Sequence, residues 1–168
     1  MTPLVSIIMG STSDLPVMEK AARQLDELAI PFEILALSAH RTPDEVAEFA
    51  RGAEERGVRV IIAGAGMAAH LCGVIASMTP LPVIGVPIKA TLDGMDALLA
   101  IVQMPPGIPV ATVGINGAQN AALLAAQMLS LGDADLKKRL KAFKEGLKEK
   151  VVRANADLKE VKYNFKTN

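Results

Sequence analysis

Five short apolar runs, separated by amphipathic helical patterns, constrain the fold of this chain more than any other feature. They cover residues 4–9, 32–37, 58–63, 82–86 and 110–115, and Val, Ile, Leu and Ala follow one another in them almost without polar interruption. Such runs are typical of parallel strands covered on both faces. The repeated strand, helix, strand order predicts right-handed crossovers and a doubly wound α/β sheet with helices on both sides.

After the third run, four helices are predicted, at about 67–78, 94–103, 117–131 and 133–153. The last carries a narrow apolar stripe on an otherwise charged surface, formed by Leu136, Leu140, Phe143, Leu147 and Val151. A narrow stripe suits docking on a neighbouring subunit, and closure of the chain's own core is the alternative. We therefore expect a single catalytic domain, residues 1–168, in which the C-terminal helix and tail, 133–168, pack on neighbouring subunits.

Length, charge and cysteine content limit which classes of protein this chain can belong to. The 168 residues suffice for one domain, and 18 Lys+Arg balance 18 Asp+Glu. The single cysteine, Cys72, cannot form an intrachain disulfide, which suits a reducing cytoplasm. The N-terminal apolar run lacks a basic lead and breaks at Gly10, and no apolar stretch approaches the length of a membrane span. We expect a soluble, cytoplasmic protein that binds neither membranes nor nucleic acid.

The loops that follow the first three runs are the candidate site, because ligands bind outside the carboxyl ends of parallel strands. In the first loop, residues 10–14, Gly10 permits a sharp turn and Ser13 is the predicted N-cap of a helix. The hydroxyls and free N–H groups suit a phosphate. Asp14 would repel a phosphate, so a ribose hydroxyl is its expected partner. An ordinary helix start explains the same residues.

The second loop, residues 38–45, contains a histidine and an arginine beside a helix start. Thr42 and Glu45 are predicted to form a capping box, with Pro43 at the first helical position. The helix N-terminus and Arg41 both disfavour positive charge on His40, so we expect a neutral imidazole that can take up a proton. Arg41 offers a forked donor to a phosphate or carboxylate. An unremarkable surface pair is the alternative.

The third loop, residues 64–70, matches the dinucleotide pattern GxGxxA. No acidic residue follows between positions 67 and 92, and the loop follows the third strand rather than the first, which argues against a nicotinamide cofactor. We interpret Gly64 and Gly66 as allowing close backbone approach to a small ligand, with His70 about one turn into a helix. Cys72 is predicted to be a buried hydrophobic side chain, and it cannot share a metal with His70 because the two lie on different helix faces.

Six segments in one order, between about residues 5 and 129, resemble a known family. They are MGSTSDLPVM, SAHRTPDEV, VIIAGAG followed by AAHL, LPVIGVP, DALLAIVQMPPGIPVATVGI and NAALLAAQML. They are similar to the class I N5-carboxyaminoimidazole ribonucleotide mutases of de novo purine biosynthesis. The resemblance implies a flavodoxin-like αβα sandwich assembled as a homo-octamer. It also implies an isomerisation without ATP, biotin or metal, in which the substrate carboxylate moves from N5 to ring carbon C4.

The resemblance implies roles for individual residues, which are listed here by role. Ser11, Ser13 and Arg41 would hold the phosphate, Asp14 the ribose and His40 the proton, while Ser38, Ala65, Gly66, His70 and Leu71 would complete the substrate pocket. A carbamate loses CO2 once its nitrogen is protonated, so one imidazole can act first as acid and then as base at C4. Such a route requires that the CO2 be kept in the pocket.

Two departures from the family loop GAGGAAHLPG are visible: Met67 stands at the third glycine and Cys72 at the proline. A side chain at position 67 is strained if that residue needs a positive φ. The segment 88–94, expected at the pocket mouth, is one residue short. Two alternatives stay open, a class II enzyme that carboxylates aminoimidazole ribonucleotide with free CO2 and a non-catalytic nucleotide-binding module.

Overall fold

The predicted strands form one parallel sheet. The computed structural model describes residues 2–168, and within them the sheet has five strands in the order β2-β1-β3-β4-β5. Their bounds are β1 Val5–Met9, β2 Phe32–Ala36, β3 Val60–Gly66, β4 Val83–Ile88 and β5 Ala111–Thr112. Each of the five predicted runs overlaps one strand, although β3 and β4 continue beyond their runs and β5 is only two residues long.

The strands differ in burial according to their place in the sheet. Nearly every residue of β1, β3 and β4 is buried, as expected for strands covered on both faces. β2 lies at an edge and none of its residues is buried, so Ile34 is 41% exposed. The prediction of full coverage on both faces is therefore confirmed for the three inner strands and wrong for β2.

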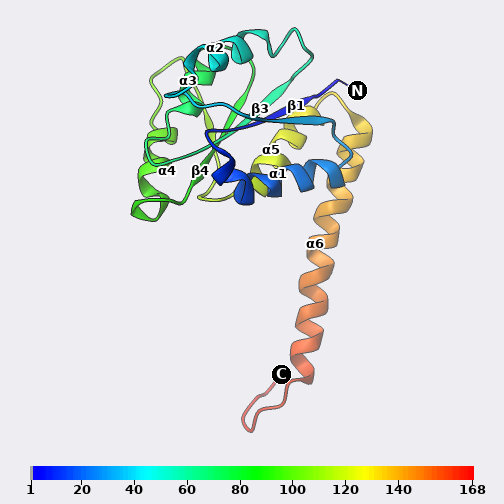
Figure 1. Ribbon diagram of the computed structural model, residues 1–168. Helices are drawn as coiled ribbons and strands as arrows, with labels where there is room; N and C mark the ends of the chain where they lie inside the picture. Colours follow the sequence, from blue (N-terminus) through cyan, green and yellow to red (C-terminus); the bar gives the residue numbers. More distant parts are fainter. Residues whose placement is uncertain (1) are drawn as a thin grey trace.

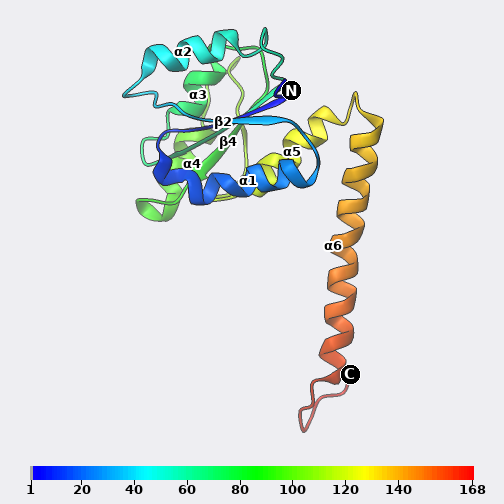
Figure 2. The ribbon, with the colours of Figure 1, turned by 45° about the vertical axis from the view of Figure 1, so that its right-hand side comes forward.

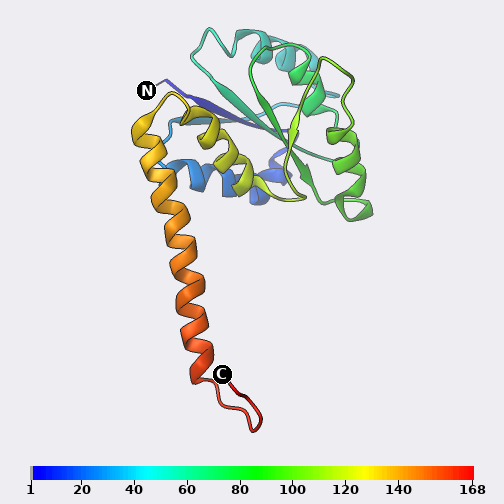
Figure 3. The same ribbon diagram turned by 180° about the vertical axis from the view of Figure 1, so that it is seen from behind.

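Helices cover both faces of the sheet (Figure 1). One face packs on α1 (Leu15–Glu27) and α5 (Ala118–Leu129), and the other packs on α2 (Pro43–Gly52), α3 (Leu71–Ala76) and α4 (Met95–Val102). α5 presents a row of buried alanines, and α1 and α5 lie side by side, as Figure 3 shows from behind. The predicted three-layer αβα sandwich of flavodoxin-like topology is confirmed.

A long final helix, α6 (Ala134–Glu160), leaves the body of the domain (Figure 2). Its 27 residues correspond to roughly 40 Å of helix, and the helix exceeds the predicted range 133–153. Asp133 caps it by accepting hydrogen bonds from the N–H groups of Asp135 and Leu136. Only Leu136 and Leu140 of α6 are buried among the described residues, so the apolar stripe leaves its own domain within two turns.

None of the helices within residues 2–168 combines the length and the apolar character that a membrane crossing needs.

Candidate active site

A cavity opens at the carboxyl ends of the central strands. The chain connects β1 to β2 on one side of β1, while β3 lies on its other side, so the crevice sits where the strand order reverses. The cavity has a volume of about 500 Å³ and takes its walls from the loops after β1, β2, β3 and β4. Its lining residues are Gly10, Ser11, Ser13, Asp14, Ser38, Ala39, His40, Arg41, Ala65, Gly66, Met67, Ala68, Leu71 and Ala90.

The loop after β1 forms a short 3-10 helix, η1 (Thr12–Asp14), before α1 begins. Ser11, and not Ser13, is the capping residue: its Oγ accepts a hydrogen bond of 3.4 Å from the N–H of Ser13. The predicted cap at Ser13 is therefore wrong, because a 3-10 turn capped by Ser11 precedes α1, and the N-cap position of α1 itself is Asp14. Both hydroxyls still line the cavity.

Asp14 is the acidic side chain of the cavity. Partial burial raises the pKa of the Asp14 carboxyl above its ordinary value of 3.8, although hydrogen bonds from Ser11 and Ser13 and the charge of Arg41 act in the opposite direction. A partly dehydrated carboxylate gains most from a ligand that donates hydrogen bonds to it. The side chain is therefore suited to pair with hydroxyl groups.

The loop after β2 is organised by its own side chains rather than by a capping box. The Oγ1 of Thr42 accepts a hydrogen bond from the N–H of Ser38 (2.9 Å) and donates one to the carbonyl of the same residue (3.2 Å), and it makes no bond to the start of α2. The predicted reciprocal box with Glu45 is therefore wrong, because the hydroxyl is already used within the loop. Pro43 does occupy the first helical position, as predicted.

Arg41 bridges two loops. Its Nη2 donates to the carbonyl of Gly10 at 2.8 Å, and its Nε donates to the Oγ of Ser38 at 3.3 Å. A guanidinium has five N–H donors in a plane, so three remain for a ligand. The two bonds fix the direction in which those donors point.

His40 contacts the second histidine of the chain. Its Nε2 lies 2.8 Å from Nδ1 of His70, and the rings meet edge to face with centroids 4.9 Å apart. One of the two nitrogens donates and the other accepts, so the facing pair carries a single proton between them. Both side chains are exposed to solvent. His40 is thus held in one orientation at the cavity while keeping access to a ligand.

The loop after β3 is tighter than the sequence predicted. α3 begins at Leu71, and His70 is its N-cap rather than a residue one turn into the helix. Residues 67–70 form successive tight turns, with hydrogen bonds from the N–H of Ala69 to the carbonyl of Met67 (2.9 Å) and from the N–H of His70 to that of Ala68 (2.8 Å). The predicted helix 67–78 is therefore wrong at its start.

Met67 has a φ of +53°. The strain anticipated for a side chain at this position is confirmed, and a non-glycine residue in such a conformation costs about 1 kcal/mol or more. Gly66 permits a close approach, because a Cβ there would lie 3.2 Å from the carbonyl oxygen of Ile88. Both residues line the cavity.

Cys72 is fully buried under the site, and its Sγ donates to the carbonyl of Ala63 at 3.2 Å. Burial raises the pKa of its thiol to about 12, which removes it as a nucleophile. Its interpretation as a buried hydrophobic side chain agrees with the structure.

Comparison with known proteins identifies the family. A family model described as AIR carboxylase matches residues 4–150. The chain belongs to the AIR carboxylase family. An N5-carboxyaminoimidazole ribonucleotide mutase from Pyrococcus abyssi is 60% identical over 147 residues, which are 87% of this chain and 84% of that protein.

A longer relative and a solved structure are also similar to this chain. A phosphoribosylaminoimidazole carboxylase from Candida glabrata is 52% identical over 162 residues, which are 96% of this chain but 28% of that protein. The crystal structure of Treponema denticola PurE has a TM-score of 0.85 and 32% identity, and the match covers 94% of this chain and 99% of that one.

Nine of the ten site residues expected for this AIR carboxylase family member line the cavity. The tenth, His70, touches the site through His40. Sequence reasoning did not assign Ala39, Ala68 or Ala90 to the site, because a methyl group carries no chemical signal. Only the expectation that segment 88–94 lies at the pocket mouth pointed toward Ala90.

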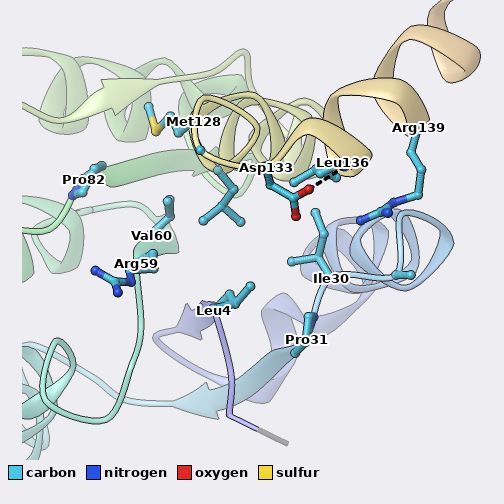
Figure 4. A pocket seen from close by; sticks show the side chains of 13 residues that line it. Leu4, Ile30, Pro31, Arg59, Val60, Pro82, Met128, Asp133, Leu136 and Arg139 are labelled. Carbon is cyan, nitrogen blue, oxygen red and sulfur yellow. Dashed lines mark hydrogen bonds between the residues drawn. The ribbon is translucent and has the colours of Figure 1, made fainter.

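A second cavity lies at the opposite edge of the sheet (Figure 4). It has a volume of about 470 Å³ and is lined by residues such as Leu4, Val60 and Pro82, at the amino ends of the strands. Asp133 on its wall caps α6, and Nε of Arg139 donates to the carbonyl of Leu28. Among the residues that the structure describes, no histidine, serine or cysteine lines this cavity. The candidate catalytic residues of this AIR carboxylase family member therefore lie in the first cavity, at the carboxyl ends of the strands.

Proposed function

We propose that this chain is a N5-carboxyaminoimidazole ribonucleotide mutase, an isomerase of de novo purine biosynthesis that moves the substrate carboxylate from N5 to C4. The observation that carries the proposal is one cavity lined by a histidine, an arginine and a carboxylate, His40, Arg41 and Asp14. These are the groups that an imidazole ribonucleotide requires: a proton carrier for the ring, a cation for the phosphate and an acceptor for the ribose.

The substrate is anchored at its sugar phosphate. The free donors of Arg41 and the hydroxyls of Ser11 and Ser13 take the phosphate, and the carboxylate of Asp14 accepts from the ribose hydroxyls. Ser38 supports this arrangement through its hydrogen bond from Arg41. With the phosphate and ribose held, the aminoimidazole ring extends toward His40 and the loop after β3.

His40 then acts as acid and as base. As an imidazolium it protonates N5, the N5–carboxylate bond breaks, and CO2 and aminoimidazole ribonucleotide form. The electron-rich C4 attacks the CO2 to make the new carbon–carbon bond, and neutral His40 removes the C4 proton. An imidazole can both donate and accept a proton, so one side chain can serve in both steps. Ala65, Gly66 and Leu71 line the region where the CO2 resides.

The proposal is tested with His40→Asn, which keeps a polar side chain but cannot carry the proton. We expect a loss of turnover of about 10²-fold or more, with binding of aminoimidazole ribonucleotide retained. Turnover is followed by conversion of N5-carboxyaminoimidazole ribonucleotide, and binding by calorimetry. A variant that loses affinity but turns over normally when saturated would contradict the proton role.

A carboxylase is the second candidate, and a specific observation favours it: the family model and the relative from Candida glabrata both carry that name. Such an enzyme would join aminoimidazole ribonucleotide and CO2 directly. The wild-type protein should therefore be supplied with N5-carboxyaminoimidazole ribonucleotide, or with aminoimidazole ribonucleotide and bicarbonate. Efficient turnover only in the second mixture would replace the mutase assignment.

We also propose a cytoplasmic homo-octamer in which α6 packs on neighbouring subunits. Leu147, Val151 and Leu158 on this helix are between 47% and 70% exposed, an apolar surface that a second subunit would cover. Native mass spectrometry should give eight times the chain mass of 17.7 kDa. Substitution Val151→Lys should lower that number while the domain stays folded, and an unchanged octamer would argue against docking through α6.

A further inference from the structure

Met67 holds a costly conformation at the start of its loop. Its φ of +53° falls in the left-handed region, directly before two tight turns that backbone hydrogen bonds close. The side chain does not compensate by filling the core, since Met67 is 57% exposed. Strain that packing does not explain is characteristic of residues kept for a functional reason.

The walls of the cavity divide by loop into a polar and an apolar part. The loops after β1 and β2 supply the hydroxyls, the carboxylate, the histidine and the guanidinium, whereas the loops after β3 and β4 supply only glycine and apolar side chains. The apolar part consists of Ala65, Gly66, Met67, Ala68, Leu71 and Ala90. Met67 has by far the longest side chain at its solvent-facing rim.

We propose that the Met67 side chain covers the apolar part of the cavity and retains CO2 between its release and its recapture. This inference rests on the mutase function proposed above. CO2 is small and uncharged, so hydrogen bonds hold it only weakly. Retention of CO2 in the pocket therefore depends mainly on excluding water and on blocking the path out of the cavity. Methionine suits this task because three rotatable bonds let it move aside for the substrate and settle over the ring afterwards.

The Met67 side chain then determines what fraction of the CO2 intermediate is recaptured and what fraction is lost. After the N5–carboxylate bond breaks, CO2 either forms the bond to C4 or escapes and is hydrated to bicarbonate, leaving aminoimidazole ribonucleotide. The second path consumes one water and delivers no product. The ratio of aminoimidazole ribonucleotide to 4-carboxy product therefore measures retention, once the aminoimidazole ribonucleotide that forms in a reaction without enzyme has been subtracted.

The experiment compares Met67→Ala and Met67→Gly with Met67→Leu, which keeps most of the covering volume. Each protein is given N5-carboxyaminoimidazole ribonucleotide in buffer containing ¹³C-bicarbonate and enough carbonic anhydrase to keep dissolved CO2 labelled. We expect the Ala and Gly variants to release roughly fivefold more aminoimidazole ribonucleotide per product and to incorporate more ¹³C, while the Leu variant resembles wild type.

Three results would overturn the inference: unchanged partitioning in both small variants, a Leu variant that leaks as much as the Ala variant, or a Gly variant that retains CO2. The Gly variant separates cover from backbone strain, since it relieves the strained φ and still lacks the side chain. If Met67→Gly retained CO2 while Met67→Ala leaked, a relaxed backbone would retain CO2 without the side chain, which refutes the proposal. Failure of the proposed function itself is distinct, because wild type would then not convert the substrate.

Discussion

Arg41→Ala gives the most direct test of how the substrate is anchored. In the structure two of the five N–H donors of Arg41 are used within the protein, by the Gly10 carbonyl and the Ser38 hydroxyl. The other three remain for a ligand in the cavity that Arg41 lines. Hydrogen bonds to charged groups contribute about 1.5–3 kcal/mol, so losing one such phosphate contact should weaken binding by roughly 10- to 150-fold.

The assay is calorimetric titration with aminoimidazole ribonucleotide and with the corresponding riboside, which lacks the phosphate. Arg41→Ala should weaken binding of the ribonucleotide but leave the riboside nearly unaffected, because only the first ligand presents the partner group. Arg41→Lys should fall between the two proteins, since it keeps the charge and loses the fork. Arg51→Ala, an exposed arginine on α2 outside the cavity, is the matched control.

Equal losses for the two ligands would refute the reasoning. The effect of the substitution would then come from the broken bridge between the loops after β1 and β2, and the phosphate would bind elsewhere. A loss of the same size in the Arg51→Ala protein would point to charge at a distance rather than to a direct contact.

Three further predictions address other parts of the molecule. His70→Asn removes the imidazole partner of His40, so kcat should fall about fivefold, far less than in His40→Asn. Equal losses of kcat in the two variants, measured in steady-state assays, would argue against a positioning role for His70. Because burial raises the pKa of Asp14, stability should decline as pH rises from 3.8 through the higher folded pKa. Asp14→Asn should abolish that decline, and parallel urea-unfolding curves for both proteins across this range would contradict it. Gly64→Ala places a Cβ 2.9 Å from Cε of the fully buried Met18. We expect this clash to lower the free energy of unfolding by about 2 kcal/mol and Tm by roughly 4–8 °C in a thermal melt. An unchanged Tm would show that the core rearranges without cost.

The strands were predictable because each is marked by a local run of apolar residues in the sequence. An uninterrupted run of branched apolar residues has few alternatives to a parallel strand, and each of the five runs overlaps one. The helix starts were less predictable. Ser13 has the right identity for a cap, but it lies inside a 3-10 turn that Ser11 caps. Thr42 does stand at the N-cap of α2, but its hydroxyl bonds to Ser38 within the loop.

The candidate site followed from topology more than from any single residue. Three loops that follow parallel strands must meet at one edge, so the polar residues in them were expected together. The pairing of His40 with His70 was not expected, because 30 positions separate the two residues and only the turns at 67–70 bring the rings into contact. Ala39, Ala68 and Ala90 gave no signal, since shape and not chemistry brings them to the cavity.

The buried thiol of Cys72 is also a natural probe of local unfolding. A sulfur with no exposed surface and a pKa of about 12 does not react with alkylating or oxidising reagents while the sheet and α3 stay packed. It is the chain's one cysteine. Labelling at this atom therefore counts only those molecules that have transiently unfolded, without any engineered probe.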